Sequence, residues 1–217
     1  MHPLVNIALR AGRDAAGVLA QQSERLDRIR AVETEAGQQV TSVEADADKS
    51  LLYHIRAAYP NHHVNSRISG EHPGKPGEPT WHLDPAIGMD NLLYGFPAFG
   101  VAIAIEINSK INHTAVLFPV LQEEFTASRG SGAQLNARRL RVRTGAELKN
   151  ALIGVNPADL DAVLLTTLIR ELIGKEGRFR ALGDTTLDIL QVAAGRYSGG
   201  WGRASSGPGL QAALLVL

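Results

Sequence analysis

The sequence predicts a layered α/β fold, and three features of its hydrophobic pattern support this prediction. Apolar residues recur at helical spacing in the first 60 residues, apolar runs of strand length follow between residues 98 and 128, and short strands alternate with helices from about residue 151. The chain has 217 residues, of which 44% are hydrophobic and 20% charged, enough for one large domain or two lobes in close contact. This order predicts helices packed on an antiparallel sheet, followed by a smaller α/β lobe.

Two helices are expected near the N-terminus. Pro3 stands in the first turn of the first helix, where its missing N–H costs nothing, and the apolar stripe consists of Leu4, Ala8, Ala11, Ala15, Val18 and Leu19. The second helix is expected to begin at Thr41 or Ser42, either of which can cap it, and to end at Tyr59 and Pro60. Residues 69–80 are so rich in Gly and Pro that we expect neither a helix nor a strand there.

The hydrophobic pattern from residue 98 onward predicts strands and further helices. Residues 98–107, 114–118 and 124–128 are expected to form neighbouring antiparallel strands. A short strand at 152–155 precedes Asn156 and Pro157, which are expected to cap a helix ending at Gly174. A basic strand at 178–180 is followed by a helix from Asp184 to Ala194. The apolar run 210–217 indicates either a shortened version of a longer fold or a segment buried against a partner.

Composition and charge exclude several classes of protein. Lys and Arg number 22, and Asp and Glu also 22, so the formal net charge of zero argues against sequence-specific DNA binding. The absence of Cys excludes a disulfide scaffold, a zinc–thiolate site and a cysteine nucleophile. No stretch reaches the roughly 20 apolar residues that span a bilayer, and charges interrupt the N-terminus before a signal peptide could form. We therefore expect a cytoplasmic protein that does not contact a membrane.

The segment from Trp81 to Asn91 carries a family signature. It resembles the pattern W-x-x-D-P-[LI]-D-G-T-x-N of the inositol monophosphatase family, and the positions kept are Trp81, Asp84, Pro85, Gly88 and Asn91. Residues 1–10, 40–44, 125–136 and 193–197 resemble the bacterial extragenic suppressor (SuhB-like) branch of that family. The resemblance implies an αβαβα sandwich of the sugar-phosphatase type. It divides the chain into an N-terminal lobe at residues 1–145 and a shortened second lobe at residues 146–217.

The resemblance also implies phosphate monoester hydrolysis by Mg²⁺ ions held on carboxylates. Such ions take oxygen ligands, lower the pKa of the attacking water and neutralise the phosphoryl oxygens. Several positions that carry this chemistry in the family are changed here: the acidic pair reads Arg67 and Ile68, the second signature Asp is Ile87, the signature Thr is Met89, and the late carboxylate matches Gly209. An acidic position that contacts inositol falls on Gly202. Asp84 remains, and Glu44 is a conservative change at the outer acidic position.

These changes predict that the metal site is vestigial and that no catalytic set is intact. A guanidinium about 5 Å from a divalent cation would repel it by several kcal/mol at an effective dielectric constant near 20. Because Asp84 alone does not offset that repulsion, no cofactor is expected. The alternative is an active Mg²⁺-dependent phosphatase acting on inositol monophosphate or a similar sugar phosphate. In that case Glu44, Glu71, Asp90 or another subunit would supply the missing ligands.

Other candidate sites have simpler interpretations. The four histidines at 54, 62, 63 and 72 lack the spacing of metal ligands, and the turn Gly130–Gly132 is typical of a hairpin. Phosphate could bind the amides at Gly88 and Met89, or those after Gly183, although Asp184 is expected to cap the helix that begins there. The arginines at 138, 139, 141 and 143 predict a solvated strand face that could also dock an acidic protein or RNA.

We therefore expect a catalytically impaired or inactive family member with a binding or regulatory role. Relatives in the SuhB-like branch act in ribosomal RNA transcription antitermination, so the resemblance implies a protein partner in the transcription machinery. A sheet edge left open in a shortened second lobe would invite association, which predicts a homodimer or larger assembly.

Overall fold

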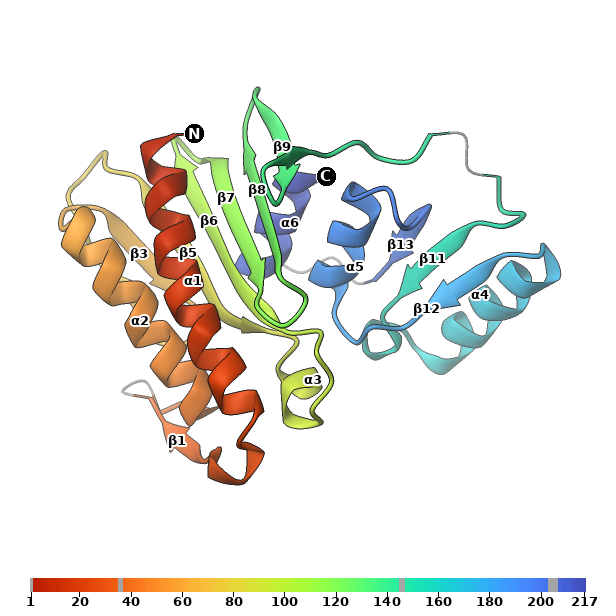
Figure 1. Ribbon diagram of the computed structural model, residues 1–217, viewed down its shortest axis with the longest axis horizontal. Coiled ribbons are helices and arrows are strands. Elements are labelled where there is room, and N and C mark those ends of the chain that lie inside the picture. Colours follow the sequence, from red (N-terminus) through yellow and green to blue (C-terminus); the bar gives the residue numbers. More distant parts are fainter. Residues whose placement is uncertain (1, 35–36, 145–146, 203–206) are drawn as a thin grey trace.

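The computed structural model describes residues 2–34, 37–144, 147–202 and 207–217, and its elements stack in layers (Figure 1). Helices α1 and α2 cover one side of a large sheet, while α5 and α6 separate that sheet from a small one, which α4 covers in turn. The helices are α1 (Pro3–Ser23), α2 (Ser42–Ala58), α3 (Met89–Leu93), α4 (Ala162–Gly174), α5 (Thr185–Ala193) and α6 (Pro208–Val216), with 3-10 turns η1 (Leu26–Arg28) and η2 (Pro157–Asp159). This αβαβα order confirms the predicted fold.

The large sheet has eight strands in the order β10-β9-β8-β7-β6-β5-β3-β4. Their bounds are β3 (His63–Ser66), β4 (Gly70–His72), β5 (Thr80–Ile87), β6 (Gly100–Ile107), β7 (Lys110–Phe118), β8 (Glu123–Ser128), β9 (Gly132–Leu135) and β10 (Arg138–Arg139). All neighbours are antiparallel except β3 and β5, which are parallel. The predicted antiparallel strands between residues 98 and 128 are confirmed, as is the hairpin turn between β8 and β9.

Two elements near the N-terminal half differ from the sequence prediction. Residues 69–80 were expected to exclude strands, but β4 lies within them and pairs with β3, with Ser66 opposite Gly70. Gly70 has a φ of 76°, so this glycine closes a tight turn between the two strands instead of ending the sheet. A separate hairpin, β1 (Ala31–Glu33) and β2 (Gln39–Thr41), leads into α2 and was not predicted.

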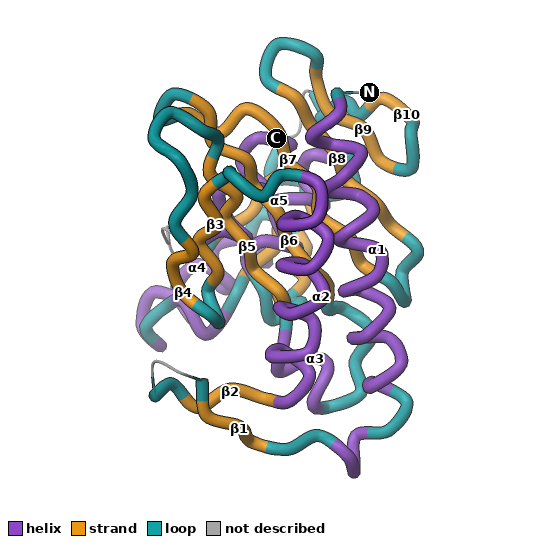
Figure 2. Tube along the Cα trace, turned by 90° about the vertical axis from the view of Figure 1, so that its left-hand side faces the viewer, coloured by secondary structure: helices purple, strands orange, loops and turns teal. Residues whose placement is uncertain are grey.

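Helices α1 and α2 lie side by side on one face of the large sheet (Figure 2). The predicted stripe of α1 faces inward: Ala8, Ala11, Ala15 and Leu19 have no exposed surface. They share a core with Trp81 of β5 and Ile103 of β6, both also fully buried. Burial of one such large apolar side chain contributes about 1.5–3 kcal/mol, so the helical spacing of this stripe explains why α1 docks on the sheet.

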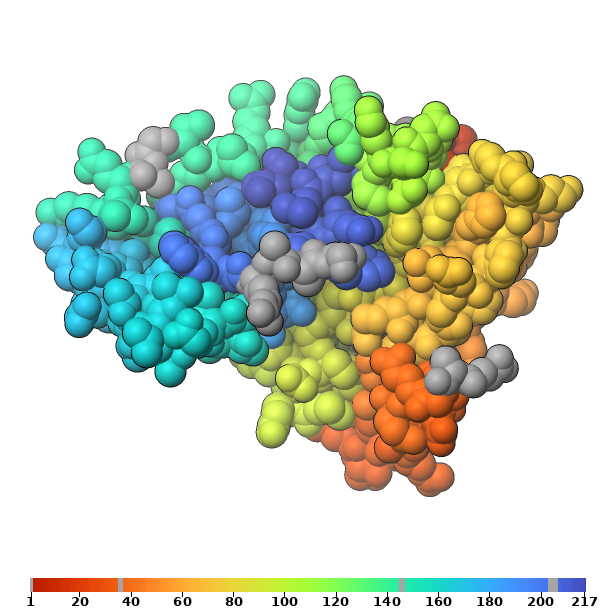
Figure 3. Space-filling model, turned by 180° about the vertical axis from the view of Figure 1, so that it is seen from behind, coloured from red at the N-terminus to blue at the C-terminus, as the bar shows by residue number. Residues whose placement is uncertain are grey.

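Helices α5 and α6 fill the layer between the two sheets. The small sheet is parallel, in the order β12 (Arg178–Arg180), β11 (Leu152–Val155), β13 (Gly199–Trp201). Helix α6 packs against β6 and β7 and buries Ala212 and Ala213 completely. Figure 3 shows this dark blue segment between the cyan second lobe and the green strands of the large sheet. The apolar run at 210–217 is thus largely buried within the chain itself, although Leu214 and Leu217 are exposed.

The helix predicted after Asn156 begins later than expected. Asn156 Oδ1 accepts from the Ala158 amide at 3.3 Å and closes only η2. The backbone is extended at Leu160, and Asp161 then caps α4 by accepting from the Leu164 amide at 2.9 Å. The predicted end at Gly174 is confirmed.

The predicted lobe boundary at 145/146 lies outside the described residues. Among the helices in the described ranges, none is long and apolar enough to cross a membrane.

Candidate functional site

Glu44 is fixed in the first turn of α2 by a capping box. Its amide donates to Thr41 Oγ1 at 3.2 Å, while Glu44 Oε2 accepts from the Thr41 amide and hydroxyl, both at 2.9 Å. A Thr followed three residues later by Glu is the sequence pattern of this motif, so the local sequence specifies it. Glu44 is 7% exposed, and its other carboxylate oxygen, Oε1, faces the interior of the site.

Arg67 joins Glu44 to Asp84. It lies in the turn between β3 and β4, where its amide donates to the Leu83 carbonyl at 3.0 Å. Its Nε donates to Asp84 Oδ1 at 2.7 Å, and its Nη2 donates to Glu44 Oε1 at 3.0 Å and to the Ala86 carbonyl at 3.1 Å. Burial disfavours the charged guanidinium, but attraction by Asp84 and then Glu44 outweighs it and raises the pKa of Arg67. The guanidinium is therefore a fixed cation between two carboxylates.

Asp84, Ile87 and Gly209 meet on the other side of this cluster. Asp84 lies near the end of β5, where the pairing with β6 shifts before Ile87. A Cβ placed on Gly209, in the first turn of α6, would lie 3.1 Å from Asp84 Oδ2 and 2.9 Å from Ile87 Cγ2. The fold thus brings together three positions that the family resemblance assigned to the metal. Two of them, Ile87 and Gly209, offer no oxygen from a side chain.

The turn from β5 to α3 carries the positions considered for phosphate. Gly88 has a φ of 67°, and the sulfur of Met89 lies 3.9 Å from Thr41 Oγ1. The Gly88 amide donates to Asp184 Oδ2 at 3.1 Å, and Asp184 Oδ1 accepts from the Leu187 amide at 3.1 Å, so Asp184 caps α5 as predicted. Burial raises the pKa of Asp184, and the charge of Asp84 adds to that rise. The Gly88 amide is therefore engaged by a carboxylate of the chain.

The other predicted positions take no part in the described side-chain hydrogen bonds of Arg67. Ile68 is 4% exposed, and its amide donates to Ser66 Oγ at 3.1 Å. Glu71 is exposed on β4, where it lines a separate cavity, and Asp90 is exposed on α3. Neither carboxylate bonds to Arg67 or Asp84. Of the three substitutes considered for the lost ligands, Glu44 alone contacts the arginine.

Gly202 lies where the resemblance placed a contact to inositol. A Cβ on Gly202 would collide with Thr185 Oγ1 and lie 3.1 Å from Asp159 Oδ2. The Thr185 hydroxyl donates to Asp159, and Asn156 Nδ2 donates to both residues, at 3.0 Å to Asp159 Oδ2 and 3.2 Å to Thr185 Oγ1. This network occupies the space next to the glycine, so a larger residue there would require Thr185 to move.

Sequence reasoning missed Asp188. This residue of α5 is 2% exposed, and neither of its carboxylate oxygens has a hydrogen-bond partner in the described part of the chain. Burial, followed by the charges of Asp184 and Asp159, raises its pKa to about 7. A Cβ on Gly154 of β11 would lie 2.8 Å from Asp188 Oδ1, so the glycine leaves the space that the carboxylate fills. The sequence does contain a feature that could have indicated Asp188, namely an acidic residue within the otherwise apolar run Leu187–Leu190.

The histidines considered as metal ligands take separate partners. His54 pairs with Asp14, His62 accepts from Trp81 Nε1 at 2.9 Å, His63 lies 2.9 Å from the Lys75 carbonyl, and His72 lies 2.7 Å from Ser69 Oγ. Within the residues that the structure describes, no group of three or more His, Asp or Glu side chains is arranged to hold a metal ion.

Comparison with known proteins establishes the family. A model of the inositol monophosphatase family matches residues 1–205. The chain belongs to the inositol monophosphatase family. Two relatives in the same family carry the name Nus factor SuhB. The Pseudomonas aeruginosa protein is 41% identical over 210 residues, which are 93% of this chain and 77% of that protein. The Escherichia coli protein is 35% identical over 202 residues, which are 92% and 76%.

A crystal structure from this family shows the same fold. The extragenic suppressor protein suhB from Bartonella henselae superposes with a TM-score of 0.90 at 27% sequence identity. The match covers 99% of this chain and 84% of that chain. The layered fold of this chain is therefore shared with that protein.

Proposed function

We propose that this chain is a catalytically impaired member of the inositol monophosphatase family with a binding or regulatory role related to transcription. The observation that supports impaired catalysis is the position of Arg67, which bonds to Asp84 and Glu44 where the resemblance placed a magnesium ligand. The guanidinium already supplies the positive charge that a metal would bring to these carboxylates.

The residues at this position do not fit Mg²⁺. The ion requires near-octahedral oxygen coordination, and it would have to displace Arg67 from Asp84 while facing the methyl groups of Ile87 and the bare backbone of Gly209. An undisplaced guanidinium about 5 Å away would oppose the ion by several kcal/mol at an effective dielectric constant near 20. We therefore expect the wild-type chain to bind Mg²⁺ far more weakly than an active relative.

Calorimetric titration with Mg²⁺ tests this proposal, with a repaired variant as the comparison. The variant combines Arg67→Glu, Ile87→Asp and Gly209→Asp; the Ile87 change removes the Cγ2 methyl that a Cβ at 209 would meet. We expect no heat of binding for the wild type at millimolar Mg²⁺ and measurable binding for the variant. Wild-type binding at millimolar affinity or better, with hydrolysis of inositol 1-phosphate at about 1 per second, would mean that the chain is an active phosphatase.

We also propose that the partner is a protein of the transcription machinery, which would place the chain in the cytoplasm. Support comes from the relatives in P. aeruginosa and E. coli, whose name is Nus factor. Affinity purification of the tagged chain from its native cells, followed by mass spectrometry, tests this. RNA polymerase subunits or transcription factors should be enriched over a tag-only control, and equal recovery from both would contradict the proposal.

Self-association is a further part of the proposed function. The end of α3 and the segment that follows it expose apolar side chains, with Leu93 at 41%, Tyr94 at 89% and Phe96 at 46%. Clustered exposed aromatic and aliphatic groups are typical of association surfaces, so we propose a homodimer. Light scattering at micromolar concentration should give twice the monomer mass of 23.2 kDa, and a stable monomer would contradict this proposal.

A further inference from the structure

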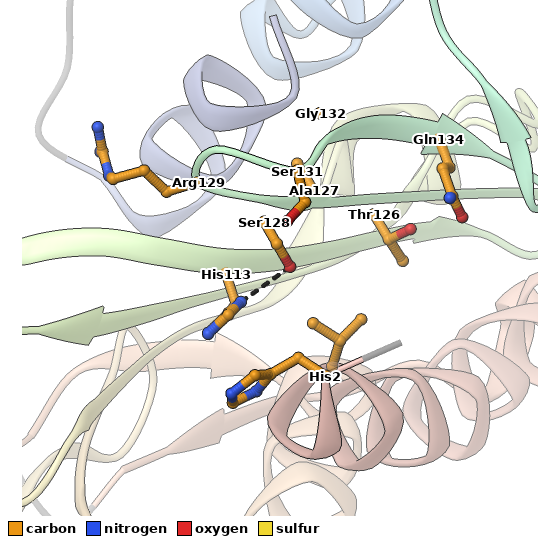
Figure 4. A pocket seen from close by; sticks show the side chains of 10 residues that line it. His2, His113, Thr126, Ala127, Ser128, Arg129, Ser131, Gly132 and Gln134 are labelled. Atoms are coloured by element: carbon orange, nitrogen blue, oxygen red, sulfur yellow. Dashed lines mark hydrogen bonds between the residues drawn. The ribbon is translucent and has the colours of Figure 1, made fainter.

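A groove between the N-terminal end of α1 and strands β7–β9 has no part in the site described above. Its volume is about 640 Å³. Figure 4 shows His2 on the α1 side and the side chains of Thr126, Ser128 and Gln134 pointing toward it from the strands. Arg129 points away from His2 in the same view. The lining is therefore polar on its strand side.

The strand register explains why these side chains share one face. His113, Ser128 and Gly132 are directly opposite one another on β7, β8 and β9. The next row places Thr126, Gln134 and Arg139 opposite one another on β8, β9 and β10. Directly paired residues project from the same face of a sheet, so Arg139 belongs to the groove face.

Two imidazoles stack at one end of the groove. The ring centroids of His2 and His113 are 4.1 Å apart, with 20° between the ring planes. His2 Nδ1 accepts from the Leu4 amide at 3.3 Å, so in the neutral ring the proton is on Nε2, which is a donor. His113 is 9% exposed, and its Nδ1 lies 2.9 Å from Ser128 Oγ. In the described part of the chain, the Nε2 atoms of both rings have no hydrogen-bond partner.

The charge around the groove is positive. A Cβ on Gly132 would lie 3.6 Å from Arg139 Nη2, so the guanidinium covers the glycine next to Ser128. Arg139 forms no ion pair with any described carboxylate. None of the described residues that line the groove carries a carboxylate. Glu124, on the same face of β8, is held by Arg13, with Nε–Oε1 and Nη2–Oε2 distances both of 2.7 Å.

We propose that this groove binds a phosphoryl group, held by the Nε2 atoms of His2 and His113 and by the guanidinium of Arg139. The group would belong to free phosphate or to a small phosphate ester. Among the described residues, two ring nitrogens without partners, a guanidinium outside any ion pair and a lining without carboxylates fit an oxyanion, to which both rings donate when protonated. The parallel stacking of the two rings does not converge their nitrogens on one metal ion. The amides of Leu4, Val5 and Asn6 are already bonded to His2, so the site depends on side chains.

Binding at this site should be linked to protonation. Burial and then the charge of His2 lower the pKa of His113. A bound anion opposes both effects and favours the charged rings, so affinity should rise as the pH falls through the usual range of histidine, about 6.5. The charged groups on the elements around the rings are Arg139 from β10, Arg129 at the end of β8, and the paired Arg13 and Glu124 from α1 and β8.

NMR titration of the imidazole signals with inorganic phosphate tests the proposal. We expect the signals of His2 and His113 to shift, their pKa values to rise, and the affinity to be several-fold higher at pH 6 than at pH 8. Sulfate stays divalent in this range, whereas phosphate takes up a proton, so the affinity for sulfate should rise more steeply than that for phosphate as the pH falls. Absence of shifts at tens of millimolar anion, shifts confined to the other histidines, or affinity independent of pH would overturn the proposal.

Two variants separate binding from folding. Arg139→Gln changes an exposed residue and should weaken binding about tenfold, because a charge-assisted hydrogen bond is lost. His2→Asn keeps a good helix cap but removes one imidazole, and should weaken binding similarly. The matched control, Arg28→Gln, lies beyond the far end of α1 and should bind as the wild type does. Equal affinity in Arg139→Gln and Arg28→Gln would overturn the assignment of Arg139.

A parallel titration with glycerol 3-phosphate shows, by tighter or weaker binding than inorganic phosphate, which source of the phosphoryl group the groove prefers.

Discussion

The chain buries acidic side chains at two places, which differ in how the negative charge is compensated. On α2 and β5, Glu44 and Asp84 both bond to the guanidinium of Arg67, at 3.0 and 2.7 Å. On α5, the carboxylate of Asp188 is as deeply buried but has no hydrogen-bond partner in the described residues. A buried charge without a partner is costly, so Asp188 takes up a proton instead, and its pKa rises to about 7.

The comparison shows two ways in which buried carboxylates are compensated in this chain. At Asp84 the guanidinium of Arg67 supplies a positive charge. At Asp188 the protein binds a proton, which makes the stability of the fold depend on pH. The stabilisation at Glu44 and Asp84 should therefore depend on Arg67, whereas the stabilisation at Asp188 should depend on pH.

The largest expected effect is the pH dependence caused by Asp188. Its pKa rises from 3.8 to about 7 on folding, so the native state binds more protons than the unfolded state between these values. The free energy of unfolding should therefore fall by about 4 kcal/mol as the pH rises from below 4 to above 7. Asp188→Asn should remove this dependence and be more stable than the wild type at pH 8, as measured by urea unfolding at several pH values.

The control for this prediction is Asp90→Asn, because Asp90 is exposed on α3. This variant should keep the pH dependence of the wild type. Identical stability profiles for the wild type and Asp188→Asn would show that Asp188 does not bind a proton on folding.

The second-largest expected effect concerns Arg67, the cation between Glu44 and Asp84. Arg67→Ala leaves Glu44 and Asp84 buried without the cation that joins them, and should lower the free energy of unfolding by about 3 kcal/mol at pH 7. This is the lower end of the range for a broken buried pair, because the side chain of Arg67 is 33% exposed. Urea denaturation measures the change, with Arg10→Ala on the exposed side of α1 as the control. A loss below about 1 kcal/mol, as in a surface ion pair, would mean that solvent compensates the carboxylates.

The smallest effect concerns the cap that orients Glu44. Thr41→Ala removes the hydroxyl that accepts from the Glu44 amide and donates to Glu44 Oε2, and should destabilise α2 by about 1 kcal/mol. Thermal unfolding followed by circular dichroism would detect the shift. Combining Thr41→Ala with Arg67→Ala should give less than the sum of the two single effects, because both changes act through Glu44. Strict additivity would indicate that the cap and the arginine are independent.

Much of the fold could be predicted from the sequence because local patterns determine it. The stripe beginning at Leu4 predicted α1, Thr41 predicted the start of α2, and Asp184 predicted the cap of α5. Where the prediction was wrong, a different local turn formed in place of the expected structure. Asn156 closed a single 3-10 turn instead of a helix, and Gly70 formed a tight turn that allowed a strand in a segment rich in glycine and proline.

The candidate site was predicted only in part. The resemblance identified the changed positions Arg67, Ile87 and Gly209, but the sequence did not indicate that Arg67 would bond to both Glu44 and Asp84. Those contacts join a helix, a turn and a strand, so they depend on how α2 packs against β5. Asp188 was missed for a similar reason, since the space that it occupies is left by Gly154 on another element.

Helical and strand periodicity and capping residues act over a few neighbouring positions, so the secondary-structure elements could be predicted from the amino-acid sequence. The family resemblance adds that acidic positions are changed at five residues, Arg67, Ile68, Ile87, Gly202 and Gly209. Which charges meet depends on packing, because electrostatic compensation acts between side chains that are distant along the chain and close in space. Packing brings Arg67 to its two carboxylates and leaves Asp188 without a hydrogen-bond partner among the described residues.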